Sequence, residues 1–475
     1  MRLTVIGTGY LGAVHAACMA EIGHEVLGVD TDRSRTEALA AGQAPFFEPG
    51  LPALLTQNTK AGRLRFTTST QEAAAFADVH FVCVGTPQRA DSLAADLRHV
   101  DAVADTLAPL LTRDSLIVGK STVPVGTTRS LSRRVSARLR SGVDAEVAWN
   151  PEFLREGHAI KDTLSPDRLV LGVTSPHAER VLREVYAPLL RAGTPCITTD
   201  PATAELVKVA ANSFLATKIS FVNAMAEVCE AAGADVVTLA DALGHDPRIG
   251  RRFLSAGLGF GGGCLPKDIR AFLARAEELR VGESVSFLRE VDRINRRQRA
   301  RTVDLARQLA GGTFEGRRVA VLGATFKPDS DDVRDSPALA VTAEIAAQGA
   351  EVAVHDPQGL DNARRALPGP AYRADVLEAC RGADLVLHLT EWRQYRTLDP
   401  AELAEVVRAP RLLDARNALD PAAWRAAGWH LRSLGRPAPV PSPGQGESPR
   451  VSIPHALGPS CTAPGAADSL SGAPK

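Results

Sequence analysis

The segment from Gly259 to Asp268, GFGGGCLPKD, holds the side chain best suited to covalent chemistry. Cys264 stands two residues before Pro266, a residue type that favours the first turn of a helix. A cysteine at a helix N-terminus lies near unpaired backbone N–H groups, which favour the thiolate, and Lys267 adds a positive charge. The pattern predicts a nucleophilic cysteine with a lowered pKa. The alternative is an inert thiol in a flexible glycine linker.

A long helical segment at residues 203–232 carries two polar side chains that could stabilise negative charge. Lys208 and Asn212 are four residues apart, so both project from one face of the helix. There an ammonium and an amide together could hold an oxyanion. A solvated ion pair between Glu205 and Lys208 is the alternative interpretation.

Glu152 and Glu156 belong to the segment NPEFLREG, residues 150–157, which directly follows an apolar run. If that run is a strand of a doubly wound sheet, both carboxylates stand at the carboxyl edge, where such folds bind ligands. Taken alone, two carboxylates in a loop are more often exposed surface groups.

The N-terminus carries a signature of dinucleotide binding. Residues 7–12 read GTGYLG between a predicted strand and a predicted helix at 10–22, and Asp30 ends the next predicted strand. Glycines in this turn let a pyrophosphate approach the helix N-terminus, and the acid accepts hydrogen bonds from ribose hydroxyls. Asp30 would repel the 2′-phosphate of NADP, so NAD is the expected cofactor. Arg33 and Arg35 nearby keep NADP open as an alternative.

The candidate site residues can lie close together only if several strands end at one edge of a sheet. The hydropathy pattern predicts such strands. Apolar runs of strand length alternate with helical stretches, which predicts an α/β fold with parallel, doubly wound sheets. A first set of strands is predicted at residues 2–7, 25–30, 78–85, 114–122, 145–151 and 168–173. A second set is predicted at residues 317–323, 350–357 and 383–390, and its opening partly repeats that of the first.

At 475 residues the chain is longer than one hydrophobic core usually holds, so several domains are expected. The pattern predicts two Rossmann-like domains, residues 1–200 and 311–435, joined by a helical core at 201–310 with one long central helix. Residues 436–475 are rich in Pro, Ser, Gly and Ala and are expected to form a disordered tail.

Charge and cysteine content argue against several classes of protein. Lys plus Arg and Asp plus Glu number 55 each, so no net field favours nucleic acid or an acidic membrane. Seven scattered cysteines without a CxxC pair indicate a reduced, cytoplasmic protein without structural zinc. The acidic residues at 329–335 lack the spacing of a metal site, so no metal is expected. No uncharged apolar run approaches the ~20 residues that span a bilayer.

The motifs together resemble those of the UDP-glucose/GDP-mannose dehydrogenase family. They run in the family's order over about residues 1–430: GTGYLG, VGTP, KSTVPVGT, NPEFLREG, AELVKVAANSFLATKISFVN, GFGGGCLPKD and GATFKPDSDDVRDSP. GFGGGCLPKD is the most specific element, and the match is best with members that oxidise UDP-glucose. The resemblance implies an NAD domain, a helical dimerisation core and a C-terminal domain that binds the nucleotide.

By matched position, the resemblance assigns residues to three roles. The catalytic residues would be Cys264, Lys208, Asn212, Asp268, Glu152 and Thr122. The cofactor NAD would be bound by Gly7, Gly9, Tyr10, Leu11, Gly12, Asp30, Arg35, Thr86, Thr122, Glu156, Lys267 and Arg334. The nucleotide sugar would be bound by Glu152, Phe153, Leu154, Arg155, Lys208, Asn212, Arg248, Phe253, Leu254, Ser255, Ala256, Gly257, Gly261 and Lys327. The chain departs from the family at Gly263, where Ser is common, and at Arg35, where Lys is usual.

The implied reaction is the oxidation of UDP-glucose to UDP-glucuronate with two NAD⁺. Taking an alcohol to an acid needs two hydride transfers, and before the second a nucleophile must add to the aldehyde. Cys264 would form the thiohemiacetal and then the thioester, and Glu152 would act as the base for its hydrolysis. GDP-mannose and UDP-N-acetylmannosamine stay open as substrates.

A homodimer is expected, with no nucleic-acid or membrane partner. The helix at residues 203–232 has more apolar surface than one small domain covers, and the resemblance implies that Arg248 reaches the neighbouring subunit's substrate. Two other classes stay open at this point. A dehydrogenase of small hydroxy acids would need no cysteine and would reduce one NAD⁺ per substrate, and a non-catalytic NAD-binding regulator would show no turnover.

Overall fold

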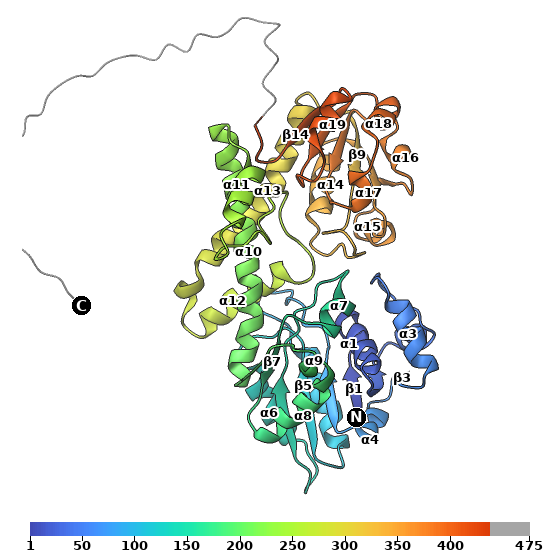
Figure 1. Cartoon of the computed structure of the whole chain (residues 1–475), viewed down its shortest axis with the longest axis vertical. Helices are drawn as coiled ribbons and strands as arrows, with labels where there is room; N and C mark the ends of the chain where they lie inside the picture. The colour runs from blue at the N-terminus through green and yellow to red at the C-terminus, as the bar shows by residue number, and fades with distance from the viewer. Residues whose placement is uncertain (438–475) are drawn as a thin grey trace, which may run out of the picture. The chain divides into compact units, whose positions relative to one another are not determined.

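Residues 1–437 are described by the structure, a computed structural model drawn in Figure 1, and they contain two separate sheets. The predicted tail at residues 436–475 lies outside this described part, except for its first two residues. Of these, Arg436 is bound to the folded protein, since its Nε donates to Asp235 Oδ2 at 2.9 Å.

Eight strands form the first sheet: β1 (Arg2–Ile6), β2 (Glu25–Val29), β3 (Leu64–Thr67), β4 (Val79–Val82), β5 (Ser115–Gly119), β6 (Ala145–Trp149), β7 (Leu169–Gly172) and β8 (Cys196–Thr199). Their order is β3-β2-β1-β4-β5-β6-β7-β8, and the first six follow the order of a dinucleotide-binding fold. The prediction of an all-parallel sheet is wrong at one step, because β6 and β7 pair antiparallel through Trp149 and Gly172. The edge strands β3 and β8 escaped prediction because they are short and only partly buried.

Helices cover both faces of this sheet: α1 (Tyr10–Glu21), α2 (Arg33–Ala40), α3 (Leu51–Lys60), α4 (Thr70–Phe76), α5 (Arg98–Leu107), η1 (Ala108–Leu110), α6 (Thr127–Ser136), α7 (Ala159–Leu164), α8 (Pro176–Val185) and α9 (Ala187–Arg191). Successive strand residues point to opposite faces. Leu3 and Val5 therefore pack with α1, α3, α7 and α8, whereas Ile6 packs with α4, α5 and α6. Burial on both faces explains why these strands read as continuous apolar runs.

The middle of the chain is helical, as predicted, and consists of α10 (Pro201–Ala232), α11 (Val236–Gly244), α12 (Leu265–Glu278), η2 (Gly282–Val285) and α13 (Phe287–Leu309). Figure 1 shows α10 as one uninterrupted helix. The Asp200 side chain caps its first turn by accepting from Thr203 N at 3.0 Å, and Gly233 ends it with a φ of 70°. α10 packs against α12 and α13 and against β6 and β7 of the first sheet.

Six strands form the second sheet: β9 (Arg318–Leu322), β10 (Glu351–His355), β11 (Ala371–Tyr372), β12 (Leu385–His388), β13 (Arg411–Asp414) and β14 (His430–Ser433). Its helices are α14 (Pro337–Ala347), α15 (Leu360–Ala366), α16 (Val376–Cys380), α17 (Arg393–Arg396), α18 (Pro400–Val406) and α19 (Pro421–Ala426). The order β11-β10-β9-β12-β13-β14, all parallel, equals that of the first six strands of the first sheet. The partial sequence repeat therefore reflects a repeated topology, and the α/β fold class is confirmed.

The two sheets differ at the acid that follows their second strand. Asp356 occupies the place after β10 that Asp30 occupies after β2, but it is only 1% exposed. Its carboxylate accepts from the backbone N–H groups of Ala324 at 2.7 Å and Thr325 at 3.0 Å and from Trp392 Nε1 at 3.2 Å. Because the Asp356 carboxylate is buried and accepts hydrogen bonds from groups of the protein, it cannot bind the hydroxyl groups of a ribose.

The predicted domain boundaries at residues 200 and 310 stay a prediction, since residues 1–437 form one compact unit. β8 ends at Thr199 and α13 ends at Leu309, close to those boundaries. Within the described part of the chain, no helix is both long and apolar enough to cross a membrane.

Candidate active site

The turn after β1 has the geometry that a pyrophosphate needs. Gly7 has a φ of 89°, which favours glycine, and a Cβ at Gly12 would stand 1.8 Å from the Gly7 carbonyl oxygen. A Cβ at Gly9, by contrast, would meet nothing within 4 Å. Gly9 is also the N-cap of α1 and supplies no capping side chain, so the first N–H groups of the helix are open to an anion. These residues therefore fit the dinucleotide that the sequence predicts.

Asp30 faces this turn. Its Oδ2 accepts from Thr8 N at 2.8 Å, and Arg35 Nη1 donates to the same oxygen at 3.0 Å. Burial by itself raises the pKa of Asp30, but the hydrogen bonds from the amides of Asp32 and Thr8 and from Arg35 hold it below its usual value. The carboxylate is thus ionised, and the Thr8 and Asp32 amides and Arg35 fix its orientation beside the glycine turn. Arg35 contacts Asp30 rather than standing free for a 2′-phosphate.

Thr86 and Thr122 meet at the carboxyl edge of the first sheet. Thr86 follows β4, Thr122 follows β5, and the Thr86 hydroxyl donates to the Thr122 carbonyl at 2.7 Å. Thr86 is buried. The structure thus brings together two residues that the sequence predicts for the cofactor, 36 positions apart.

Cys264 is the N-cap of α12, with Pro266 in the first turn, as the sequence predicts. The Cys264 residue is exposed. Asp268, one turn further, is almost fully buried, and its backbone N–H donates to the Cys264 carbonyl at 2.9 Å. The first turn of α12 therefore fixes the cysteine and the carboxylate relative to one another.

The glycines before Cys264 lie directly against the second half of the chain. A Cβ at Gly261 would stand 2.3 Å from the Asp335 carbonyl oxygen, and one at Gly262, where φ is 85°, would stand 2.8 Å from the Phe326 ring. Gly262 N also donates to the Arg334 carbonyl at 3.0 Å. The segment is therefore a packed contact and not a flexible linker.

Side chains from three segments form a hydrogen-bonded group of three residues and a hydrogen-bonded pair beside the cysteine. Asn212 Nδ2 on α10 donates to Asp268 Oδ2 at 2.7 Å, and Lys267 Nζ donates to Asp268 Oδ1 at 2.5 Å. Lys208 Nζ, also on α10, donates to Glu152 Oε1 at 3.1 Å. Lys208 and Asn212 are both buried.

The interpretation of Glu205 and Lys208 as a solvated pair is wrong. The Glu205 carboxylate is buried and accepts from the backbone N–H groups of Gly126 and Thr128, both at 2.6 Å. Glu205 thereby caps the N-terminus of α6, and Lys208 is left to bind Glu152.

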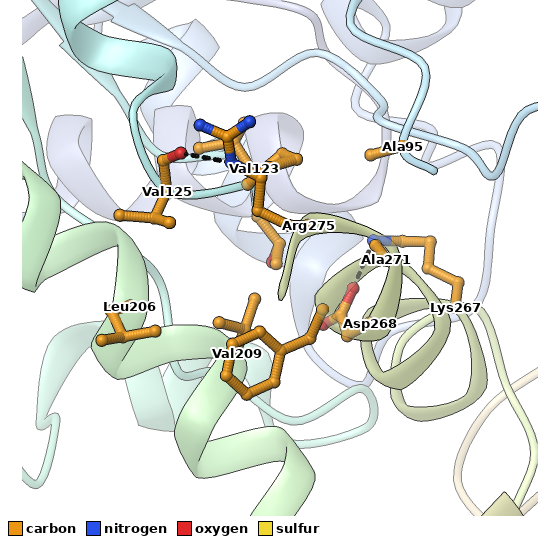
Figure 2. A pocket seen from close by; sticks show the side chains of 12 residues that line it. Ala95, Val123, Val125, Leu206, Val209, Lys267, Asp268, Ala271 and Arg275 are labelled. Carbon is orange, nitrogen blue, oxygen red and sulfur yellow. Dashed lines mark hydrogen bonds and ion pairs between the residues drawn. The ribbon is translucent and has the colours of Figure 1, made fainter. Parts of the chain in front are cut away.

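A small cavity marks where the elements of the site converge. Residues 122–125 after β5, Leu206 and Val209 of α10, and the first turns of α12 line one space of about 10 Å³. Figure 2 shows how Val123, Val209 and Asp268 lie around it. Arg275 Nε crosses it to donate to the Val125 carbonyl at 2.9 Å. The volume is about what a single water molecule requires.

The pKa values correct the expectation for Cys264. The pKa of its thiol is raised to about 12, because surrounding protein desolvates the thiolate and Asp268 repels it more than Lys208 attracts it. The predicted lowered pKa is therefore wrong for the protein in this state. Burial lowers the pKa of Lys208, but the negative charges of Glu152 and Asp268 and the hydrogen bond to Glu152 outweigh this and raise it.

Glu156 connects the first sheet to the segment after β9. Ser330 Oγ donates to its Oε2 at 3.0 Å, Arg334 Nη2 approaches its Oε1 at 3.5 Å, and Lys327 Nζ donates to its carbonyl. Desolvation and the charge of Asp332 raise the pKa of Glu156 to about 7 against the opposing cations. Residues predicted for the cofactor and for the sugar thus meet across this contact.

The segment predicted to hold the sugar, Phe253 to Gly257, packs against the loop after β13. Asn417 Nδ2 donates to the Ala256 carbonyl at 3.2 Å, and Gly257 N donates to Asn223 Oδ1 of α10 at 2.9 Å. Phe253 has a φ of 65°, a conformation that a bulky residue rarely adopts. Such strain is often found at functional sites.

Two arginines predicted for the substrate are not part of this cluster. Arg155 pairs with Asp162 at 2.7 Å, and Arg248 pairs with Asp246 at 2.6 Å with 87% of its side chain exposed. Both arginines therefore bind carboxylates that are not part of the group around Cys264.

Sequence reasoning missed two buried charged residues. Lys120, directly after β5, binds Asn150 Oδ1 at 2.9 Å, and Glu48 accepts from the N–H groups of Gly157 at 2.7 Å and Ala159 at 2.8 Å. Lys120 stands at the end of an apolar run, which was the one available signal. Among residues 1–437, no group of three or more His, Cys, Asp or Glu side chains could hold a metal ion.

The first sheet, its glycine turn and Asp30 define a dinucleotide-binding dehydrogenase fold. Comparison with known proteins specifies the class. Residues 1–190, 202–297 and 320–421 match, in turn, the NAD binding domain, the central domain and the UDP binding domain of the UDP-glucose/GDP-mannose dehydrogenase family.

Individual relatives span nearly the whole chain. The UDP-glucose 6-dehydrogenase of Rhizobium meliloti is 42% identical over 92% of this chain and all of its own length. A UDP-glucose dehydrogenase from Pyrobaculum islandicum is 39% identical, with a TM-score of 0.82 over 89% of this chain and 98% of its own. A UDP-D-ManNAc dehydrogenase from Pyrococcus horikoshii is 27% identical, with a TM-score of 0.81 over 92% of this chain and 99% of its own.

The chain belongs to the UDP-glucose/GDP-mannose dehydrogenase family. It is therefore an NAD-dependent dehydrogenase of a nucleotide sugar. This family membership argues against the two other classes that the sequence left open, a hydroxy-acid dehydrogenase and a non-catalytic regulator.

Proposed function

We propose that the protein oxidises UDP-glucose to UDP-glucuronate, reducing two NAD⁺ per sugar through a covalent intermediate on Cys264. The observation that carries the proposal is the position of Cys264 at the N-terminus of α12, next to the Asn212–Asp268 and Lys208–Glu152 pairs. The names of the relatives from R. meliloti and P. islandicum support the choice of UDP-glucose.

The cofactor binds along the carboxyl edge of the first sheet. Gly9 leaves room for the pyrophosphate, Asp30 accepts from the ribose, and Thr86 and Thr122 line the path toward Cys264. NAD⁺, when bound, supplies the hydride acceptor and a positively charged ring. The protein's own side chains carry out the other steps, which are the covalent attack, the stabilisation of the oxyanion and the hydrolysis.

Cys264 adds to the aldehyde formed in the first oxidation. Its Sγ bonds to the carbonyl carbon while its proton leaves, and the second oxidation turns the thiohemiacetal into a thioester. The charged amine of Lys208 and the amide of Asn212 stand on the adjacent face of α10, where they stabilise the oxyanion. Asp268 lies one turn from Cys264, where it takes the proton that leaves the thiol, and it orients Asn212.

Hydrolysis of the thioester releases the acid. Glu152, held at Oε1 by Lys208 and at Oε2 by Leu154 N at 2.7 Å, activates the water. Thr122 lines the small cavity beside Asp268 and helps to place water there.

The nucleotide part of the substrate binds between the Phe253–Gly257 segment and the segment after β9. Lys327 and Gly261 line this region, and the matched UDP binding domain at residues 320–421 supports it. NADH formation with UDP-glucose, GDP-mannose and UDP-N-acetylmannosamine tests the proposal. Two NADH per sugar with UDP-glucose alone are expected. Preferred turnover of another sugar, or one NADH per sugar, would contradict it.

We also propose a homodimer formed through α10. Four large apolar side chains on this helix are exposed at seven- or eight-residue intervals: Leu206, Phe214, Phe221 and Val228. Such spacing forms a stripe along one side of a helix, and a second copy of the chain would cover it. The exposed Arg248 would then reach the sugar in the neighbouring subunit.

A further inference from the structure

Lys120 is a buried cation at the centre of the first sheet's carboxyl edge. It follows β5, it is 7% exposed, and its backbone N–H donates to the Val82 carbonyl at 2.9 Å. Within residues 1–437 it forms no ion pair within 4.0 Å, since no carboxylate contacts its Nζ. Burying an ammonium without an anion costs free energy that a neutral side chain of similar length would avoid.

The hydrogen bonds of Lys120 reach Asn150 and, at 3.5 Å, the hydroxyl of Tyr186. Its Nζ donates to Asn150 Oδ1 at 2.9 Å and approaches the Asn150 carbonyl at 3.4 Å. Tyr186 OH donates to the same Oδ1 at 2.6 Å, and Asn150 Nδ2 donates to the Val170 carbonyl at 2.9 Å. The Asn150 side chain is thus held from three sides.

Asn150 begins the loop that carries the proposed base. Only Pro151, whose ring restricts the backbone, separates it from Glu152. The anchored Asn150 therefore limits where the Glu152 carboxylate can stand. Glu152 also receives the positive potential of Lys120, although the two do not touch.

We infer that Lys120 is a positioning residue for thioester hydrolysis, which holds Glu152 in place through Asn150. The inference rests on the proposed function, because it assigns a step of that reaction. The hydrogen bonds of the Lys120 side chain go to Asn150 and Tyr186, so it acts through these neighbours.

The groups around Lys120 leave Glu152 as the carboxylate on which its charge acts. The thiol of Cys83 after β4 and the imidazole of His15 on α1 are both neutral near pH 7, since burial raises the pKa of Cys83 to about 12 and lowers that of His15. Tyr186 is neutral as well, because burial raises its pKa. From α10, Lys208 repels Lys120.

Burial also lowers the pKa of Lys120 to about 8, so its charge is lost at mildly alkaline pH. Hydrolysis should then slow above that pH while the preceding steps are less affected.

The test replaces Lys120 by Met, which keeps the length of the side chain and removes its charge. Lys120→Met should keep or raise the Tm, because it removes a buried lone cation. It should still release a first burst of NADH, after which steady turnover falls at least about tenfold. Mass spectrometry of the intact protein should find the acyl sugar on Cys264, and the alkaline decline of kcat near pH 8 should disappear.

Two further variants make the test decisive. Lys60→Met makes the same change at an exposed position on α3 and should behave as the parent protein. Glu152→Gln should accumulate the same adduct. If it does and Lys120→Met does not, the inference about Lys120 is wrong while the covalent route stands. If neither variant accumulates an adduct, the proposed route fails, and the inference with it. Turnover of Lys120→Met within about twofold of the parent would also overturn it.

Discussion

Cys264 is exposed as a residue, yet the protein around its sulfur favours the protonated thiol. Desolvation of the thiolate by the surrounding protein raises the pKa of Cys264 to about 12, and the repulsion by Asp268, which exceeds the attraction by Lys208, adds to this. In the proposed mechanism, Cys264 can therefore attack an aldehyde in one of two ways. Either the thiol proton leaves as the carbon–sulfur bond forms, or the positively charged ring of bound NAD⁺ lies beside the sulfur and stabilises the thiolate. The sequence motif contains both Cys264 and Asp268, but it does not convey the surrounding protein that desolvates the thiolate or the approach of Lys208.

Replacing Cys264 tests the covalent step. Cys264→Ala should bind NAD⁺ and the nucleotide sugar but lose overall oxidation by at least about a thousandfold, because the second hydride transfer lacks its thiohemiacetal. Cys264→Ser should accumulate an ester, since an oxygen ester hydrolyses more slowly than a thioester, and intact-mass measurement would detect it. Two NADH per sugar from Cys264→Ala at near-parent rate would contradict the mechanism.

Glu156 should make stability depend on pH. Its pKa is about 7 in the folded protein and near 4.5 in the unfolded chain, so folding favours the protonated form. This contribution is complete below about pH 4.5 and is lost as pH rises through 7, and it amounts to at most about 3 kcal/mol. Glu156→Gln should lack this loss. Urea unfolding of both proteins from pH 5 to 8 measures the difference, and parallel stability curves would refute the assignment.

The glycine run before α12 joins the two halves of the chain at the scale of elements. Gly261, Gly262 and Gly263 admit the Asp335 carbonyl, the Phe326 ring and the Arg334 guanidinium where a Cβ would stand. The departure at Gly263 has a local consequence. A serine at residue 263 would displace the Arg334 guanidinium. The observed position of Arg334 therefore requires glycine at residue 263.

A pair of alanine variants isolates this close approach. Gly262→Ala should lower the free energy of unfolding by about 2–4 kcal/mol, because a positive φ disfavours alanine by about 1–2 kcal/mol and its Cβ would also press on Phe326. Gly142→Ala is the matched control, since its φ is 82° and its Cβ would meet nothing within 4 Å. Chemical denaturation compares the two. If both variants lost the same free energy of unfolding, the Phe326 ring would be able to move away from the added Cβ at little cost.

At the scale of the whole molecule, α10 links the site to the proposed dimer. One side of the helix presents Lys208 and Asn212 to the site, and another exposes Phe214 and Phe221. A change of assembly would therefore act on the helix that carries the proposed catalytic side chains Lys208 and Asn212.

Phe214→Glu should convert the dimer to a monomer of low activity, because a buried charge opposes association. Sedimentation velocity with parallel assays measures both properties. Leu93→Glu, a similar change at an exposed loop residue, is the control and should stay dimeric. A fully active monomer would contradict the proposal.

Mixing Arg248→Ala with Cys264→Ala tests sharing of the site within that dimer. If Arg248 serves the neighbouring subunit, each mixed dimer contains one complete site, and about a quarter of parent activity returns. No recovery would place Arg248 in its own subunit's site.

By itself, the sequence determined the fold class, the repeated sheet, the long helix and the places where reactive residues stand on their elements. These properties depend on local periodicity, on glycine and proline, and on motifs that are contiguous in the chain. It missed β3 and β8, whose short, partly exposed runs carry little pattern, and it missed the antiparallel step at β6 and β7.

Only the tertiary structure decided which charges meet. Glu205 turned out to cap α6 from 77 residues away, Lys208 to bind Glu152 across 56 residues, and Lys120 to anchor Asn150. The pKa of Cys264 followed from the same kind of contact. Burial and the distances between charges set these properties, and both depend on how distant segments pack, which no local pattern records.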